Sequence, residues 1–184
     1  MTSRSTKRQS ADERRARRAE IDDPAVVMEA AAAFMAVRPR SVAEARRRLR
    51  RLGYRDVLIE QVIERLLEMG YLDDADFARA WVESRDRARP KGEIALRREL
   101  QLKGVAADTV AKVLDERAAV AQGNADLGAG MALLERRRTA LRRVPDERKR
   151  RQKAYALLAR NGFDPEVCRA ASTAFVAGED AAEN

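Results

Sequence analysis

The residues that most often carry out chemistry in proteins are scarce in this sequence. There is no histidine among its 184 residues, so a histidine general base, metal ligand or triad is excluded. The single cysteine, Cys168, lies in an apolar-periodic run and is interpreted as a core residue. The glycines from Gly123 to Gly130 lack the preceding strand and the Gly-Lys-Ser/Thr ending of a phosphate loop. We therefore expect no enzyme, no catalytic residue, no metal site and no cofactor.

Three aspartates, at positions 73, 74 and 76, stand close enough together to suggest a divalent-cation site. They also stand where a helix is expected to begin, and carboxylates at that position cap backbone N–H groups and complement the helix dipole. We prefer the capping interpretation, with Asp73 or Asp74 as the cap. Phe77 and Trp81, one helical turn further on, could stack on nucleic-acid bases. In a chain with only 4% aromatic residues, we interpret them as core.

Basic residues are abundant and unevenly distributed. The chain has 38 Lys and Arg against 30 Asp and Glu, a formal net charge of +8. An alternative view, that arginine is merely a soluble helix former, explains the abundance but not the segregation. We therefore predict a surface that faces a polyanion. The net charges are +6 over 38–51, +4 over 85–103, +8 over 136–153, −5 over 54–76 and −4 over 163–184.

This predicted surface supplies the candidate binding residues. They fall on the second helix of each expected repeat and on the segment that enters it, and we expect these helices to align as one basic stripe if the repeats stack in register. The candidates are Arg46, Arg47, Arg50, Arg51, Arg85, Arg89, Lys91, Arg97, Arg98, Lys103, Arg137 and Arg150.

The elements that must position these side chains are helices. Ser41 followed by Glu44 is a capping box, and Gly53 is placed to end the helix that starts there. Ala45 and Leu49 lie on one stripe, and arginines fill the remaining surface. No stretch alternates with a period of two, so the sequence predicts an all-α protein.

The same pattern occurs three times, anchored on a glycine followed by an apolar residue. The glycines are Gly53, Gly104 and Gly162, and a leucine stands four positions before each. Further apolar columns lie eight before, six after and nine after the glycine. Four aligned columns indicate a tandem repeat. These columns are Leu49, Leu100 and Leu158; Ala45, Leu96 and Ala154; Ile59, Val110 and Cys168; and Val62, Val113 and Ala171.

We predict three tandem three-helix repeats that form an elongated, curved array, with a polar arm before them and a short tail after them. A short helix over 11–20 is possible within the arm but would be marginal alone. The expected divisions are a disordered basic arm at 1–22, repeat 1 at 23–70, repeat 2 at 71–121, a flexible joint at 122–130, a degenerate repeat 3 at 131–177, and an acidic tail at 178–184.

Composition also indicates the cellular compartment in which the protein is expected. A lone cysteine permits no intrachain disulfide and suits a reducing compartment. No apolar run approaches the length of a membrane span, and the basic N-terminus has no apolar segment like that of a signal peptide. We expect a cytoplasmic protein, a monomer, with no membrane partner and no small-molecule substrate.

Several strings in this sequence resemble the RecX family of bacterial recombination regulators. They are Arg-Pro-Arg-Ser41-Val-Ala-Glu-Ala with Leu49-Arg-Arg-Leu-Gly53-Tyr54, then Gly70-Tyr-Leu-Asp-Asp-Ala-Asp-Phe77, then Leu100-Gln-Leu-Lys-Gly104-Val. The resemblance is specific over residues 28–116 and looser over 131–176. It implies three tandem three-helix repeats, no catalytic residues, and binding in the groove of the RecA–single-stranded DNA filament, which limits filament extension or stability.

We therefore predict a protein that modulates, and most simply inhibits, RecA by binding its filament through a basic surface. One alternative is a general nucleic-acid-binding helical repeat protein without a dedicated protein partner. It predicts equal affinity for bare single strands and for filaments. A second alternative is an adaptor that holds a partner helix in apolar grooves between repeats, with binding that is insensitive to salt.

Overall fold

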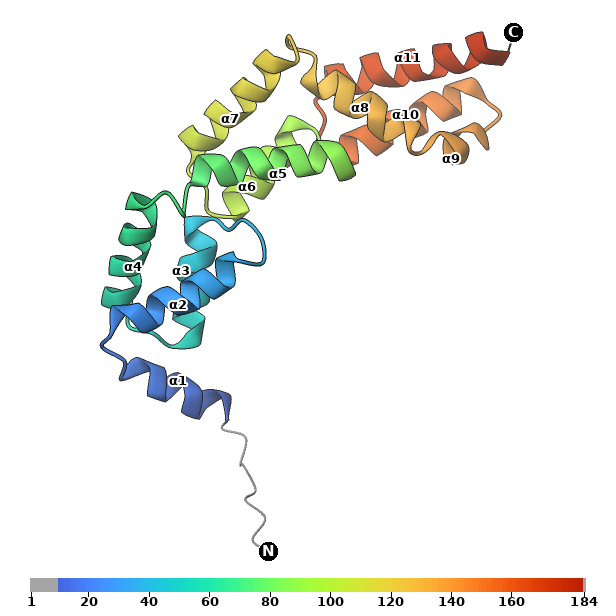
Figure 1. The fold of residues 1–184 in the computed structure, drawn as a ribbon. Coiled ribbons are helices and arrows are strands. Elements are labelled where there is room, and N and C mark those ends of the chain that lie inside the picture. Colours follow the sequence, from blue (N-terminus) through green and yellow to red (C-terminus); the bar gives the residue numbers. More distant parts are fainter. Residues whose placement is uncertain (1–9, 184) are drawn as a thin grey trace, which may run out of the picture. The chain divides into compact units, whose positions relative to one another are not determined.

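The computed structural model describes the backbone of residues 10–183 and the side chains of residues 10–178. Every regular element in these residues is a helix, which confirms the all-α prediction (Figure 1). The chain divides into two compact units, Met1–Asp74 and Ala75–Asn184, which we call unit 1 and unit 2. Residues 1–9, which are the first part of the expected arm, and Asn184 lie outside the described residues.

Unit 1 contains a three-helix group built from α2 (Pro24–Met35), α3 (Val42–Leu52) and α4 (Asp56–Glu68). Side-chain caps set the starts of α2 and α3: Asp23 accepts a hydrogen bond from the Ala25 N–H at 2.9 Å, and Ser41 Oγ accepts one from the Glu44 N–H at 3.1 Å. The three helices pack pairwise around one apolar core. The buried side chains of this core include Val27, Ala45, Leu49, Ile59 and Ile63.

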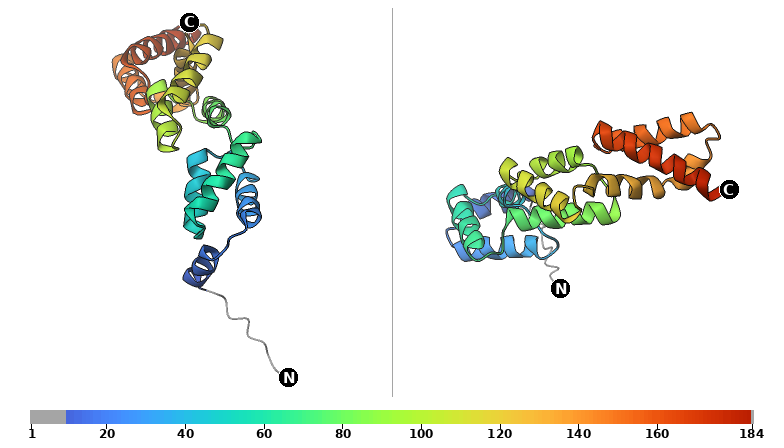
Figure 2. Two further views of the ribbon diagram at one scale, coloured as in Figure 1. Left: turned by 90° about the vertical axis from the view of Figure 1, so that its left-hand side faces the viewer. Right: turned by 90° about the horizontal axis from the view of Figure 1, so that it is seen from above.

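Unit 2 contains two further groups, each with its own apolar core (Figure 2). The first comprises α5 (Asp74–Ala88), which starts at the unit boundary, α6 (Glu93–Leu102) and α7 (Ala107–Val120). The second comprises α8 (Ala125–Glu135), the short α9 (Arg138–Arg142), α10 (Glu147–Arg160) and α11 (Pro165–Glu183). In the second group α8, α10 and α11 pack against one another.

The threefold pattern read from the sequence is confirmed in the structure. The leucine four positions before each glycine is fully buried at Leu49, Leu100 and Leu158. In each repeat its carbonyl accepts a hydrogen bond from the residue after the glycine, at 3.4, 3.1 and 3.4 Å respectively. The three glycines have φ of +100°, +86° and +77°, a left-handed conformation that ends a helix and favours glycine.

The N-terminal region differs from the disordered arm that we expected over 1–22. Residues Ala11–Ala19 form α1, which starts with a complete capping box between Ser10 and Glu13. Tertiary contacts hold this marginal helix in place: Arg18 Nη1 donates a hydrogen bond to the Leu52 carbonyl at 3.5 Å, and the Arg18 guanidinium lies 5.9 Å from the centre of the Tyr54 ring. Sequence alone undervalued α1 because its helix-forming tendency is weak without these contacts.

The segment 122–130 was expected to be a flexible joint, but the structure differs from that prediction, because α8 begins within the segment at Ala125. Gly130 is buried inside that helix, and a Cβ there would lie 3.4 Å from Leu158 Cδ2. The glycine thus permits close packing of α8 against α10, whereas the sequence analysis interpreted it as part of a flexible joint. Within the expected repeat 3, α8 ends at Glu135 and is followed by the short α9, and α11 continues to Glu183, into the expected acidic tail at 178–184.

Candidate nucleic-acid interface

In unit 1 the predicted basic helix α3 carries its free charge on the side away from the core. Arg47 and Arg51, one turn apart, are outside the core and have no ion-pair partner among the described residues. The buried stripe of Ala45 and Leu49 fixes this orientation, since an α-helix places these two arginines on the opposite side. Arg47 and Arg51 are therefore the residues of α3 best placed to meet a polyanion.

Arg46 and Arg50 belong to a different set of contacts. The Arg46 guanidinium binds both carboxylate oxygens of Glu60, Nε to Oε1 at 2.8 Å and Nη2 to Oε2 at 2.6 Å, and Arg50 Nε binds Asp56 at 2.7 Å. Hydrogen bonding to Arg46 lowers the pKa of the Glu60 carboxyl below its ordinary value. The acidic α4 thus neutralises one flank of α3, and these two predicted site residues are tied within the unit.

A second basic group in unit 1 surrounds Phe34 and was not among the predicted site residues. The Arg40 guanidinium lies 3.9 Å from the centre of the Phe34 ring, and that of Arg48 lies 5.8 Å from it. Arg40 Nε also donates a hydrogen bond to the Phe34 carbonyl at 3.3 Å. Both arginines occur in the basic 38–51 segment, so its charge was the signal available in the sequence.

In unit 2 the equivalent helix, α6, divides its arginines in the same way. Arg98, six positions before its glycine as Arg47 is before Gly53, is exposed and has no ion-pair partner among the described residues. Arg97, which corresponds to Arg46, binds Glu93 at 2.5 Å. The repeated register therefore leaves an outward arginine free in both units.

Two more predicted residues, Arg85 and Lys103, flank the indole of Trp81. The Arg85 guanidinium lies 4.3 Å and the Lys103 ammonium 4.7 Å from the ring centre. Glu99 accepts hydrogen bonds from Trp81 Nε1 at 2.9 Å and from Arg85 Nε at 2.7 Å. Phe77 is buried and Trp81 half-buried, which agrees with their interpretation as core.

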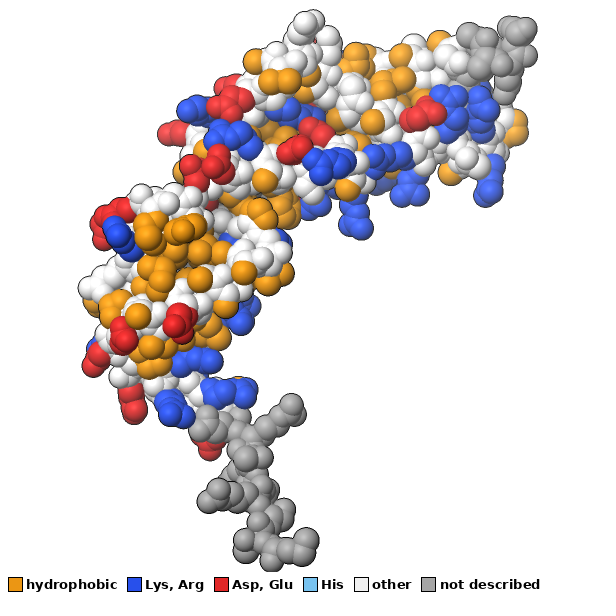
Figure 3. Space-filling view, in the orientation of Figure 1, with side chains coloured by type: hydrophobic (Ala, Val, Ile, Leu, Met, Phe, Trp, Pro, Cys, Tyr) orange, Lys and Arg blue, Asp and Glu red, His pale blue; other side chains and the backbone are white. Residues whose placement is uncertain are grey.

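Three predicted residues line one cleft of about 310 Å3 in unit 2: Arg89 and Lys91, which are close in sequence, and the distant Arg137. Arg136, which the sequence analysis did not select, lines it as well. In Figure 3, basic side chains gather along one edge of unit 2, over the end of α5 and over α9 and α10. The remaining candidate, Arg150, is half-buried and donates to the Val144 carbonyl at 3.3 Å, between α9 and α10.

The three aspartates near the start of α5 were expected to cap a helix rather than to bind a cation. No group of three or more metal-ligating side chains occurs among the described residues. Asp74 instead accepts a hydrogen bond from the Val42 N–H at 2.9 Å, so it caps α3. Burial, and secondarily the charge of Asp73, raise the pKa of the Asp74 carboxyl above its ordinary value.

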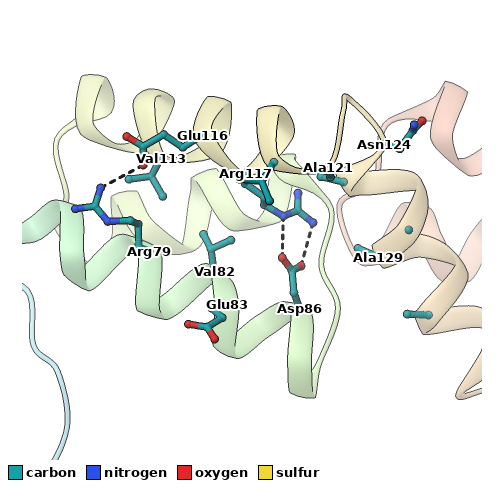
Figure 4. Close-up of a pocket in the computed structure, with 14 residues that line it drawn as sticks. Arg79, Val82, Glu83, Asp86, Val113, Glu116, Arg117, Ala121, Asn124 and Ala129 are labelled. Carbon is teal, nitrogen blue, oxygen red and sulfur yellow. Dashed lines mark hydrogen bonds and ion pairs between the residues drawn. The ribbon is translucent and has the colours of Figure 1, made fainter.

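An apolar hollow of about 620 Å3 lies between α5, α7 and α8 in unit 2 (Figure 4). Its charged groups are paired: Arg79 binds Glu116 at 3.2 Å, Arg117 binds Asp86 at 2.9 Å, and Glu83 binds Arg87 beside the hollow. Arg117 also binds Asp126 at 2.6 Å. Burial works against the charge of Arg117, but the hydrogen bonds to the two aspartates raise its pKa. This groove is therefore a poor site for a polyanion.

The fold and these surfaces define a class: an all-helical protein of three repeated three-helix groups that presents unpaired basic side chains. Among the described residues, no helix combines the length and apolarity needed to cross a membrane. Family models match the groups in chain order, as the RecX first, second and third three-helix domains, over residues 28–66, 73–114 and 126–171. The third match begins inside the stretch expected to be a joint.

Sequence relatives give the same assignment. Regulatory protein RecX of Prosthecochloris aestuarii is 36% identical over 140 residues, which are 74% of this chain and 84% of that protein. Regulatory protein RecX of Mycobacterium marinum is 35% identical over 137 residues, which are 73% of this chain and 75% of that protein. This chain therefore belongs to the RecX family of regulatory proteins, which confirms the resemblance.

Solved structures share the fold at low sequence identity. RecX from Lactobacillus salivarius superposes with a TM-score of 0.71 at 18% identity, covering 84% of this chain and 97% of that one. A second RecX structure gives a TM-score of 0.68, also at 18% identity, and covers 82% of this chain and 71% of that one. At this identity the likeness establishes the fold alone.

Proposed function

We propose that this protein regulates RecA by binding the RecA–single-stranded DNA filament through its basic surfaces, and that it limits filament extension or stability. The observation that carries the proposal is the repeated arginine register: Arg47 in unit 1 and Arg98 in unit 2 occupy the same repeat position, outward and unpaired among the described residues. Regulation here takes place by binding, in the cytoplasm, and serves recombinational DNA repair.

Two features support a polyanionic partner over a neutral one. The outward arginines lie opposite the buried stripe, so they are unused by the fold, and the acidic helix α4 lies against the other flank of α3. The formal charge of +8 gives long-range attraction to nucleic acid. Membership of the RecX regulatory family supports RecA, in its DNA-bound filament, as the partner.

The test compares wild type with the variant Arg47→Glu, Arg51→Glu and Arg98→Glu. We expect the variant to lose inhibition of RecA filament growth, measured as strand-exchange or ATPase activity of RecA on single-stranded DNA. A matched control reverses three basic residues outside the proposed interface, with Arg65→Glu on α4, Lys112→Glu on α7 and Arg169→Glu on α11. Equal inhibition by wild type and the triple variant, with circular dichroism unchanged, would refute the assignment.

Binding to RecA-coated and bare single-stranded DNA across a salt series separates the proposal from the general nucleic-acid binder. We expect tighter binding to the filament at every salt concentration. Equal affinities, with a logarithmic salt slope of about −0.7 per phosphate contact, would favour a protein that binds only the nucleic acid.

The apolar groove of Figure 4 is the observation that favours the adaptor alternative. It has an apolar lining that includes Val82, Val113 and Ala129, and its charges are internally paired. An adaptor would bind RecA without DNA and with little salt dependence. Introducing Val120→Glu, at a groove position that is 88% exposed, would then weaken binding, whereas the filament proposal predicts no change.

A further inference from the structure

The basic cleft of unit 2 forms where three helices end close together. The C-terminal ends of α5, α8 and α10, at Ala88, Glu135 and Arg160, surround it, and the linker after α5 closes it. Arg89, Lys91, Arg136 and Arg137 line the cleft, and none of the acidic side chains that the structure describes does. At about 310 Å3 it is at the small end of the range of ligand pockets, which is about 300–1,000 Å3.

A purely structural explanation accounts for two of the four cations. Arg136 donates hydrogen bonds to the Ala88 and Arg87 carbonyls at the end of α5, 2.6 Å in the case of Arg87. Lys91 Nζ donates to Asn161 Oδ1 at 3.1 Å, next to the end of α10. Cations at helix C-termini complement the negative end of the dipole, so these two side chains help to build the cleft.

The other two cations have no such use. Arg89 and Arg137 are exposed, and neither makes a side-chain hydrogen bond or ion pair with a described residue. Each helix end contributes about half a negative charge, so the three ends offset only about 1.5 of the four positive charges. The cleft therefore keeps a clear positive surplus, concentrated on the two arginines that are free to meet a ligand.

We propose that this cleft binds one phosphodiester group of a single-stranded nucleic acid. The inference rests on the proposed function in that the ligand belongs to a nucleic acid. Arg89 and Arg137 donate to the non-bridging phosphate oxygens, which the planar guanidinium fits in a two-pronged manner. Lys91 and Arg136, held by the helix ends, keep the site positive, and the partly buried Leu133 and Leu157 form an apolar wall that excludes water.

The experiment measures binding of the full-length protein to fluorescein-labelled oligothymidylate by fluorescence anisotropy, at several salt concentrations. The test variant is Arg89→Gln with Arg137→Gln. The matched control, Arg143→Gln with Arg148→Gln, removes the same charge from exposed positions of unit 2 outside the cleft. We expect the cleft variant to bind about tenfold more weakly than the control, and its salt slope to be shallower by about 0.7, the value for one phosphate contact.

A conservative variant, Arg89→Lys with Arg137→Lys, keeps the charge and guards against a folding defect. We expect it to recover most, but not all, of the affinity, because lysine lacks the two-pronged geometry. Melting temperatures from circular dichroism accompany each variant. A cleft variant that is folded and binds as well as the control would overturn the proposal.

Pyrophosphate distinguishes a nucleic-acid phosphate from a small phosphate ligand. If the nucleic acid is the ligand, pyrophosphate competes only weakly, and the difference between cleft and control variants is seen with the oligonucleotide. Tight pyrophosphate binding that is lost in the cleft variant, with oligonucleotide affinity unchanged, would overturn the assignment. The cleft variant could keep its affinity for the oligonucleotide while the Arg47, Arg51 and Arg98 variant loses filament inhibition. That combination would refute the cleft as a phosphate site and leave the proposed function standing.

Discussion

Two aspartates, Asp74 and Asp126, have the same role in successive repeats. Asp74 accepts a hydrogen bond from the Val42 N–H at 2.9 Å, and Asp126 accepts one from the Glu93 N–H, also at 2.9 Å. Each donor is the N–H of the first residue of the second helix of a repeat, and each acceptor lies at the start of the following repeat. The aspartate thus caps a helix of the repeat before it.

The raised pKa of Asp74 gives a pH-dependent prediction. The folded state holds the proton of this carboxyl to higher pH than the unfolded chain does. Its contribution to stability is therefore greatest below the unfolded pKa, near 4, and is lost as the pH rises through the raised folded pKa. Asp74→Asn keeps the acceptor but removes the charge. We expect the free energy of unfolding of this variant, relative to wild type, to increase from about pH 3.5 to 7 in urea titrations.

Asp74→Ala is the matched control, because it removes the acceptor as well. We expect it to be less stable than Asp74→Asn by about 1 kcal/mol at neutral pH, the usual effect of losing a helix cap. A constant difference between wild type and Asp74→Asn across this pH range would contradict the assignment of the pH effect to Asp74.

Arg117 gives a second prediction at the scale of residues. Its side chain is only 11% exposed and binds Asp86 (Figure 4). It also binds Asp126 at 2.6 Å. Arg117→Met leaves two poorly exposed carboxylates without their partner, so we expect a loss of about 3 kcal/mol in the free energy of unfolding. Arg79→Met, which removes a more exposed ion pair in the same groove, should cost less than about 1 kcal/mol. Equal losses would show that burial of Arg117 is unimportant.

At the scale of elements, α1 takes the place on repeat 1 that α6 takes on repeat 3. The left-handed glycine of repeat 3, Gly162, lies against Ala95 of α6, and that of repeat 1, Gly53, lies against Arg15 of α1. In both cases a helix backbone lies against a glycine, with no room for a Cβ. We infer that α1 caps the end of the array, as terminal elements of repeat proteins do.

Gly53→Ala tests this packing. The new Cβ would lie 2.5 Å from Arg15 Cγ and 2.7 Å from the Arg15 carbonyl oxygen, and φ of +100° is strained for alanine. Gly70→Ala is the control, since Gly70 has φ of +71° but nothing within 4 Å of a Cβ. We expect Gly70→Ala to lose about 1 kcal/mol from backbone strain, and Gly53→Ala to lose more.

Release of α1 has its own measurement. We expect trypsin to cleave after the arginines of α1 faster in Gly53→Ala than in Gly70→Ala or wild type, because a helix that is no longer packed opens more often. Equal cleavage rates and equal stability losses would show that α1 does not depend on its contact with Gly53.

At the scale of the whole molecule, free basic side chains occur in both units. Arg47 and Arg51 lie in unit 1, and Arg98 and the basic cleft lie in unit 2. A chain that holds one polymeric ligand through two units gains affinity from linkage, because the second contact forms at a high effective concentration. The charge of +8 is thus expected to act through two separate sets of contacts.

Linked binding predicts how charge reversals in unit 1 and unit 2 combine in their effect on filament affinity. We expect Arg47→Glu with Arg51→Glu to weaken filament binding about tenfold to a hundredfold, and the further change Arg98→Glu to bring it near the detection limit. Fluorescence anisotropy on RecA-coated single-stranded DNA measures both steps. A triple variant no weaker than the double variant would indicate that only unit 1 contacts the filament.

The sequence by itself determined the repeat and its core. Periodicity, capping residues and left-handed glycines are local properties, and they suffice to place Leu49, Leu100 and Leu158 in equivalent buried positions. Charge segregation is equally local, and it identified the basic helices. It could not separate Arg46, which binds Glu60, from Arg47, which binds no described acid, because that difference depends on a second helix.

Only the tertiary structure decided the features that depend on contacts between distant segments. It brought Arg89 and Lys91 together with Arg136 and Arg137 in one cleft, although more than 40 residues of sequence lie between the two pairs. It also stabilised α1 and the glycine-containing α8, whose local helix preferences are weak. The physical reason is the same in each case: packing and ion pairing act over distances in space, and local sequence patterns record only neighbours along the chain.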